Sequence, residues 1–315
     1  MRTILVAGWL VAVIGVVGSV SATSLSVQEP VARFRSNVDL VRISAIVRDR
    51  KGRFVRDLKA QDFEVLEDGH PRPIADFRHD DSGASLAILL DASGSMQAQF
   101  GNAREALAHL LAWLKSDHDE TAVFAFDTHL AEVSAFGAAL STPPDGLSVM
   151  TPFGATSLHD AIAGAAARVA TRRGRRTAVV VLTDGRDTAS HLRPNEVSAM
   201  AGAIDVPVYI VGIVSSVDNP AADVGVVEAA RSPLAGPLAD LASETGGQAF
   251  VASSIVERST VARRIVEELR HQYLIAFEAG TAPGWHSLVV RARGKNLTVR
   301  TRSGYSAGQS RPNSQ

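Results

Sequence analysis

Residues 86–97 read LAILLDASGSMQ, and this stretch decides the fold. An uninterrupted apolar run, Leu86–Leu90, ends directly at Asp91, and two serines follow at Ser93 and Ser95. A continuous apolar run of this length, bounded by Gly and polar residues, is typical of a strand that is buried on both faces. Such strands belong to sheets covered by helices, so the stretch predicts an α/β fold with polar side chains at a strand end.

Two later segments carry matching polar residues. Residues 178–187 read AVVVLTDGRD, in which a second apolar run is followed by Asp184. Residues 153–160 read FGATSLHD and supply Thr156. In an open α/β sheet, ligands bind beyond the carboxyl ends of the strands, where the strand order reverses. We therefore expect the polar side chains of the three segments to meet at that edge of the sheet.

The candidate ligands all present hard oxygen atoms, which favours a small divalent cation. They are Asp91, Ser93, Ser95, Thr156 and Asp184. Mg²⁺ takes six oxygens in near-octahedral geometry and keeps several waters, and two carboxylates, three hydroxyls and water meet that demand. Mn²⁺ and Ca²⁺ remain alternatives. The chain has no Cys, and none of the candidate ligands is His, so zinc and copper are disfavoured.

Several of these residues also have an ordinary structural interpretation. Ser93 and Ser95 can cap the following helix, and Asp184 can begin a turn. Asp187 can hydrogen-bond to a metal ligand without contacting the metal itself, but a solvated loop carboxylate is the favoured interpretation. Asp160 is expected in the first turn of a helix, where the helix dipole favours a carboxylate.

Taken together, the three segments resemble a known family. DASGS at 91–95 matches the D-x-S-x-S signature of von Willebrand factor A domains. GATSLHDA at 154–161 looks like the segment that carries the family's metal-binding Thr, and LTDGRD at 182–187 looks like its T-D-G segment. The resemblance runs through about Ser85–Arg270. It implies a doubly wound, mostly parallel six-stranded sheet with a Rossmann-like arrangement. It also implies that the candidate ligands form a metal-ion-dependent adhesion site (MIDAS).

The A domain, assigned to residues 85–270, is flanked by segments with strand periodicity. Apolar and polar residues alternate through Val41–Val47 in the segment 37–80, and again in three short runs of the segment 271–306. Three strands with one apolar face are marginally stable alone. We therefore infer that the two segments pack together as one β-sandwich-like module, into which the A domain is inserted. Within the A domain, Val133–Phe136 is expected to be a short strand.

The flanking segments carry a second, less specific resemblance. Residues 54–77 (FVRDLKAQDFEVLEDGHPRPIADF), together with VRTRSGY at 299–305, resemble the bacterial VWFA-related proteins first described in acidobacteria. Residues 307–315 are polar and are expected to form a disordered tail.

The N-terminus has the pattern of an export signal. Residues 1–22 combine an early arginine, an apolar stretch and small residues that end in V-S-A at Ala22. We expect cleavage near Ala22 and a periplasmic or secreted product. The alternative is an uncleaved membrane anchor, although the apolar stretch is short for a membrane span.

Composition limits the classes of partner. The chain has 315 residues, of which 46% are hydrophobic and 21% charged, enough for one sizeable core and a smaller module. The formal net charge of -1 creates no global field for nucleic acid or for an anionic membrane. One local basic cluster is expected to be a solvated helix end. It consists of Arg172, Arg173, Arg175 and Arg176.

These observations favour a non-enzymatic binding module, in which the cation accepts an Asp or Glu carboxylate from a protein partner. One alternative is a scaffold with a purely structural metal. Another is a Mg²⁺-dependent phosphoryl-transfer enzyme with Asp91 as nucleophile. That scheme usually requires a second acid where Ser93 stands, and the chain has no Walker-type phosphate loop. The scattered histidines indicate no triad, and His159 is expected at a helix surface or rim.

Overall fold

The structure is a computed structural model, and both modules described below fall within one compact unit. It describes residues 40–79, 82–172, 174–203, 205–215, 234, 236–294 and 296–307. The predicted leader and residues 308–315 of the predicted tail lie outside these ranges, whereas Ala307, the first residue of that tail, is the last residue of a strand. Within them, no helix is both long enough and apolar enough to cross a membrane.

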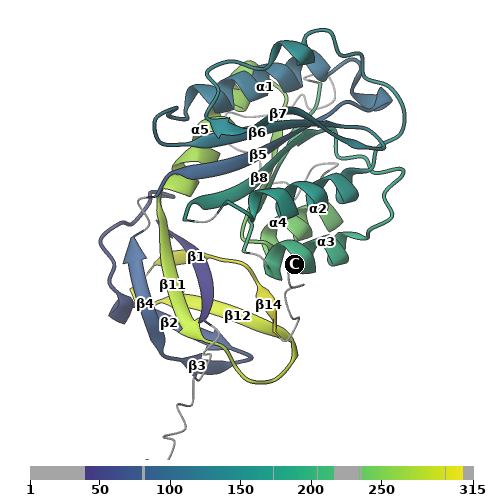
Figure 1. The fold of residues 1–315 in the computed structure, drawn as a ribbon. Coiled ribbons are helices and arrows are strands. Elements are labelled where there is room, and N and C mark those ends of the chain that lie inside the picture. Colours follow the sequence, from purple (N-terminus) through teal and green to yellow (C-terminus); the bar gives the residue numbers. More distant parts are fainter. Residues whose placement is uncertain are drawn as a thin grey trace, which may run out of the picture. The chain divides into compact units, whose positions relative to one another are not determined.

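A six-stranded sheet with the order β10-β9-β8-β5-β6-β7 forms the core of the A domain (Figure 1). Its strands are β5 (Ala84–Asp91), β6 (Glu120–Phe126), β7 (Leu130–Ala138), β8 (Arg176–Thr183), β9 (Val208–Ile213) and β10 (Ala249–Ala252). All neighbouring strands are parallel except β6 and β7, which are antiparallel. The doubly wound, mostly parallel six-stranded sheet expected from the sequence is confirmed.

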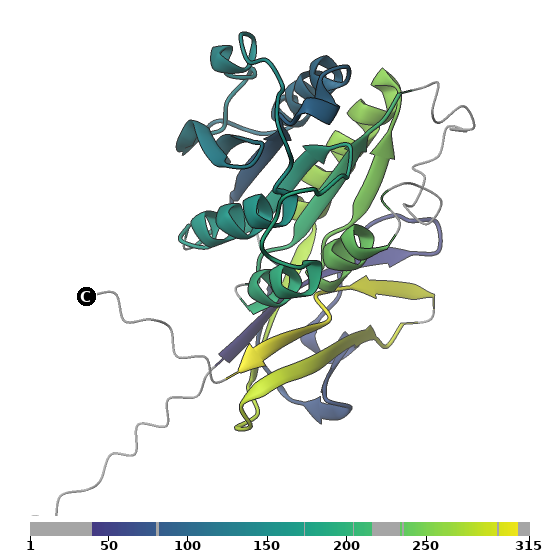
Figure 2. The same cartoon turned by 90° about the vertical axis from the view of Figure 1, so that its right-hand side faces the viewer.

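Helices cover both faces of this sheet, as Figures 1 and 2 show. One face carries α1 (Phe100–Ala112) and α5 (Ile255–Arg270), and the other carries α2 (Leu158–Val169), α3 (Pro194–Ala203) and α4 (Pro237–Glu244). Every residue of β5 is buried. Leu86 and Ile88 join the core beneath α1 and α5, whereas Leu89 joins the opposite core. Because alternate side chains of a strand point to opposite faces, a strand covered on both sides has to be apolar throughout.

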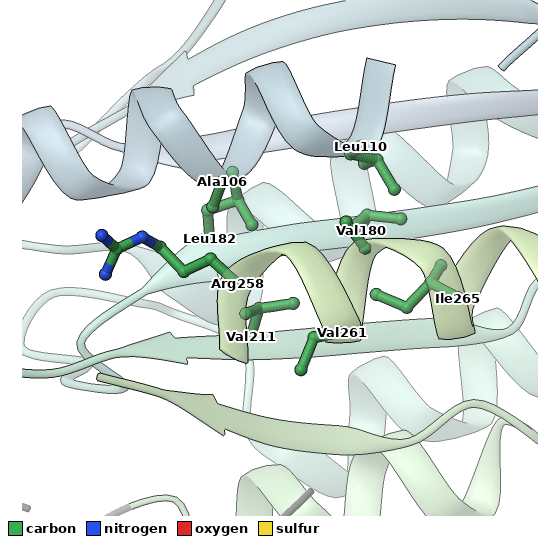
Figure 3. Close-up of a pocket in the computed structure, with 9 residues that line it drawn as sticks. Ala106, Leu110, Val180, Leu182, Val211, Arg258, Val261 and Ile265 are labelled. Carbon is green, nitrogen blue, oxygen red and sulfur yellow. The ribbon is translucent and has the colours of Figure 1, made fainter. Parts of the chain in front are cut away.

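The layer between α1, α5 and the sheet is tightly filled. A void there is large enough for no more than a water molecule. Among the side chains that line it are Leu110 of α1, Val180 of β8 and Val261 of α5 (Figure 3). Arg258 also lines it, and its Nε donates to Glu105 Oε2 at 3.0 Å. This layer offers no room for a ligand.

Strands from both flanking segments form the second module. They are β1 (Leu40–Asp49), β2 (Phe63–Glu67), β3 (His70–Arg72), β4 (Ile74–His79), β11 (Gln272–Glu278), β12 (Gly284–Ala292), β13 (Leu297–Arg300) and β14 (Gly304–Ala307). They pair into two four-stranded sheets, β13-β1-β11-β4 and β14-β12-β2-β3. Ile43 and Ile275 of the first sheet share one apolar core with Phe63 and Val290 of the second. The β-sandwich-like module expected from the N- and C-terminal segments is confirmed. Short 3-10 helices occur at Ala60–Asp62, Gly94–Met96 and Asp145–Leu147.

Strand β1 lies between two strands that follow the A domain in the sequence. Ile43 pairs with Ile275 of β11, and Val47 pairs with Val299 of β13, both in antiparallel register. The first sheet is therefore built from both flanks of the A domain.

A buried carboxylate joins α5 to this module. Glu268 of α5 is completely buried. Its Oε1 accepts hydrogen bonds from Arg48 Nη2 of β1 at 2.9 Å and from Arg264 Nε at 3.4 Å. Its Oε2 pairs with Arg300 of β13. Arg264 and Arg300 also share the Oε1 of Gln248, at 3.0 and 2.5 Å. One carboxylate thus holds three guanidinium groups from three elements.

The basic cluster expected to be a solvated helix end is instead paired, so that expectation is wrong. Arg172 and Arg175 both contact the Glu120 carboxylate, at 3.0 and 3.3 Å. Arg176 begins β8, is buried, and donates to a carbonyl of α5 at 2.6 Å. Arg173 lies outside the described residues. Arg172 and Arg175 bind a carboxylate at the start of β6, and Arg176 binds a carbonyl of α5. The segment that leads into β8 is therefore attached to both elements.

A buried histidine ties the β2–β3 turn to β12. His286 Nδ1 lies 2.7 Å from Asp68 Oδ2, and its Nε2 lies 2.8 Å from the carbonyl oxygen of Ala282. Both partners are acceptors, so this geometry requires a proton on each ring nitrogen. The carbonyl of Ala282 and the carboxylate of Asp68 raise the pKa of His286 above its usual value.

We expect protonated His286 to stabilise the folded protein, so the free energy of unfolding should fall as the pH rises and the proton is lost. Because the folded pKa is raised, its contribution is complete below about pH 6.5, the ordinary His value, and is lost as pH rises through the folded pKa. The pKa values of Glu67 and Asp68 are lowered and that of Tyr305 is raised, so these neighbours titrate outside this window. Urea unfolding from pH 5.5 to 8.5 should show a steeper loss for wild type than for His286→Gln. Parallel curves would contradict the assignment.

Candidate metal centre

Asp91 is the last residue of β5, and hydrogen bonds fix both of its carboxylate oxygens. The side chain is completely buried. Its Oδ1 accepts the backbone N–H of Ser93 at 3.0 Å, and its Oδ2 accepts the hydroxyl of Thr183 at 2.6 Å. The carboxylate therefore has one defined orientation at the carboxyl end of the central strand.

The environment of Asp91 disfavours the ionised form of its carboxyl group. Burial raises the pKa of Asp91, and the nearby carboxylate of Asp184 acts in the same direction, although hydrogen bonds from Ser93 and Thr183 partly oppose it. A buried, like-charged pair of carboxylates is the arrangement that a bound cation stabilises. The residues present thus fit the divalent cation that the sequence predicts.

The two serines after Asp91 contribute neighbouring hydroxyls. Ser93 is completely buried and Ser95 is exposed, and their Oγ atoms lie 3.2 Å apart. Ser93 is the N-cap residue of the 3-10 helix at Gly94–Met96, but its side chain makes no capping hydrogen bond. Its hydroxyl faces Ser95, so helix capping does not account for this residue.

Backbone hydrogen bonds hold the Thr156 segment against the turn after β5. The N–H of Phe153 donates to the carbonyl of Ala92 at 2.9 Å, and the N–H of Gly94 donates to the carbonyl of Gly154 at 3.0 Å. These bonds bracket Ser93 from both sides, so the second predicted segment contacts the first.

Thr156 itself links the second segment to the residues that directly follow the third. It is buried, and its N–H donates to Thr188 Oγ1 at 2.9 Å. Its carbonyl accepts the N–H groups of Thr188 and Ala189, each at 2.9 Å. The three segments picked out in the sequence therefore come together through named hydrogen bonds.

Asp184 follows β8 and is mostly buried, with 17% of its side chain exposed. Its Oδ1 accepts the N–H of Arg186 at 3.1 Å, which is the local turn predicted as its alternative role. Its Oδ2 lies 3.9 Å from Arg186 Nε, beyond hydrogen-bond length. The turn and a ligand role are compatible, because the turn uses Oδ1.

Thr183 is a site residue that the sequence reasoning missed. Its hydroxyl donates to Asp91 and accepts the N–H of Gly185 at 3.0 Å. The parallel register explains the contact: Leu90 of β5 pairs with Leu182 of β8, so the next residues, Asp91 and Thr183, stand side by side. The signal was present as the Thr before Asp184 in LTDGRD.

His159 and Asp187 form a second polar pair next to Thr156, and both expectations about them are wrong. His159 is buried rather than at a rim, and its Nδ1 lies 2.6 Å from Asp187 Oδ2. Burial alone would raise the pKa of Asp187, but hydrogen bonds from Ser190 and His159 lower it. Asp187 therefore fastens the loop after β8 to α2 instead of being solvated. Asp160 lies in the first turn of α2, as predicted.

The donor set is dominated by hydroxyls. Among the residues that the structure describes, no three His, Cys, Asp or Glu side chains cluster in a way that could hold a metal ion. Two carboxylates with Ser and Thr hydroxyls suit a hard, oxygen-seeking cation better than zinc.

Comparison with known proteins gives a family for this region. The model of the von Willebrand factor type A domain matches residues 86–186, a stretch that contains all of the candidate ligands. None of the curated proteins matches the chain.

Several solved structures are similar to the chain. A von Willebrand factor type A protein from Catenulispora acidiphila is 14% identical and has a TM-score of 0.47, with 87% of this chain and 76% of that one covered. BatB from Bacteroides thetaiotaomicron is 16% identical, with a TM-score of 0.46 and coverage of 59% and 98%. Proximal thread matrix protein 1 from the mussel byssus, with a zinc-occupied MIDAS motif, is 20% identical, with a TM-score of 0.47 and coverage of 64% and 49%.

Proposed function

Residues 86–186 belong to a von Willebrand factor type A domain, and from this premise we propose that the protein is an exported, metal-dependent protein-binding module. One observation carries the proposal. The buried carboxylate of Asp91 is oriented by Thr183 at the carboxyl end of β5, with the hydroxyls of Ser93 and Ser95 beside it. The segment of Thr156 is bonded to the same turn.

We assign the cation to Asp91, Ser93, Ser95, Thr156 and Asp184. A bound Mg²⁺, Mn²⁺ or Ca²⁺ would offer a coordination position to an Asp or Glu carboxylate of a protein partner. Only two of the five assigned residues are charged, so the protein ligands do no more than balance a divalent cation. A third carboxylate from a partner then meets no excess negative charge. Thr183 and the N–H of Ser93 hold Asp91 in place.

The residue two positions after Asp91 favours binding over phosphoryl transfer. A phosphoryl-accepting Asp usually has a second acid there, but this position holds Ser93, whose hydroxyl lies 3.2 Å from that of Ser95. We therefore propose a non-enzymatic role. Export is proposed from the leader in residues 1–22 alone, with cleavage near Ala22 and a periplasmic or secreted product.

Capture experiments with the exported form, residues 23–315, test this function. Immobilised wild type should retain a protein from envelope or secreted fractions in millimolar Mg²⁺ or Mn²⁺ and release it in EDTA. Folded Asp184→Ala should retain none. If wild type still retains the protein in EDTA and the variant also retains it, the proposal is contradicted, and a scaffold with a structural metal is favoured. Turnover of a generic phosphoester above the level of Ser93→Ala would favour the enzyme.

A further inference from the structure

The two most exposed large apolar side chains in the described part of the chain lie in one segment, just before Thr156. Val149 is 85% exposed and Phe153 is 82% exposed. Val256 of α5 follows at 61%. Single exposed apolar residues are ordinary, but two at such exposure, four positions apart and beside a candidate binding site, indicate a contact surface.

The exposure of these two side chains does not come from a poorly packed segment. Leu147 is completely buried and Pro152 is buried, while Met150 packs against the core beneath α1 and α5. Apolar residues on one side of the segment thus anchor it. Val149 and Phe153 project from its other side into solvent.

The backbone fixes Phe153 at the rim of the candidate metal centre. Its N–H donates to the carbonyl of Ala92 at 2.9 Å, and the following residue, Gly154, accepts from Gly94 at 3.0 Å. Ala92 and Gly94 are the neighbours of Ser93 in the chain. A partner that places a carboxylate at the centre would therefore lie next to the Phe153 ring.

The charge at the rim complements an acidic partner. Arg186 follows Asp184 in the turn after β8, and 75% of its side chain is exposed. With a divalent cation balanced by Asp91 and Asp184, Arg186 adds an exposed positive charge next to Asp184. The surface thus combines a positive charge that attracts a carboxylate with the exposed apolar side chains of Val149 and Phe153.

We propose that the partner is a protein segment in which the metal-binding Asp or Glu has an aromatic or large aliphatic neighbour, which packs against Phe153 and Val149. Because Phe153 is bonded to Ala92, next to Ser93, we place this neighbour within about two positions of the acid in an extended segment, which advances about 3.3 Å per residue. The inference rests on the proposed function and names the chemistry of its partner.

A peptide display library with one fixed Asp, flanked by random residues, tests the inference. Selection is carried out on residues 23–315 in Mn²⁺, and bound peptides are eluted with EDTA. Wild type should enrich aromatic or large aliphatic residues within two positions of the Asp. Phe153→Ser should lose that preference and bind the selected peptides about ten- to hundredfold more weakly, as expected for uncovering one large apolar contact. The matched control, Val289→Ser, removes an exposed apolar residue from β12 of the second module and should bind like wild type.

The other outcomes separate the two proposals. Metal-dependent enrichment without an apolar preference would overturn the inference and leave the proposed function standing. No metal-dependent enrichment would overturn both. Self-association of wild type in sedimentation, lost in Phe153→Ser, would show that a second copy of the chain covers this surface and would also overturn the inference.

Discussion

Asp184→Ala should abolish the rise in melting temperature that divalent cations give the wild-type protein. A ligand present at a hundredfold excess over its Kd stabilises the folded state by about 2.7 kcal/mol, which corresponds to roughly 5 °C for a domain of this size. The variant loses one of the two carboxylates assigned to the cation. Thermal melts of residues 23–315 in EDTA and in millimolar Mg²⁺ or Mn²⁺ measure the effect.

Two further variants make this test specific. Thr183→Val keeps the side-chain shape but removes the hydroxyl that orients Asp91, so it should reduce the metal-dependent rise without abolishing it. Asp91→Asn should abolish the rise, yet be as stable as wild type or more stable in EDTA. Burial raises the pKa of Asp91, so its charge costs stability when no cation is bound. A full metal-dependent rise in Asp184→Ala would place the cation elsewhere.

Glu268→Ala should lower the free energy of unfolding by about 3–5 kcal/mol, the range seen when one partner of a buried ion pair is removed. Glu268 is completely buried and binds Arg48, Arg264 and Arg300, so its loss leaves three guanidinium groups without their shared carboxylate. Denaturant unfolding of the purified variant measures the loss.

The neighbouring residue supplies a matched control. Glu267 contacts Arg263 at 3.7 Å on the exposed surface of the same helix. Exposed pairs of this kind contribute about 0–1 kcal/mol, so Glu267→Ala should change stability little. Equal losses in the two variants would mean that the buried cluster does not stabilise the junction of α5 with β1 and β13.

The fold was predictable from the sequence where burial dictates the residue type. Strands β5 and β8 are covered on both faces, so their central residues, Leu86–Leu90 and Val179–Leu182, are all apolar and the strands could be recognised. The edge strand β7 was predicted only as Val133–Phe136, whereas the strand runs from Leu130 to Ala138. Much of this strand is exposed, so its apolar pattern is too weak to mark its ends.

The site was predictable only in part, for a related reason. Asp91 and Asp184 follow apolar strands, and that local signal places them at the edge of the sheet. The hydroxyl of Thr183 and the pairing of His159 with Asp187 depend on which strands and loops become neighbours. Such contacts join residues 28 or 92 positions apart, and nothing in the local sequence specifies them.

The pairing of β1 has a consequence for how the chain is made. Synthesis proceeds from the N-terminus, but the first strand that pairs with β1 begins only at Gln272, after the whole A domain. Until then the nascent chain carries a strand with one apolar face whose edge along Leu40–Ile46 is unpaired, which is the kind of segment that aggregates. The A domain can be complete while this module is still half built, so the last strands synthesised are the ones that close the molecule.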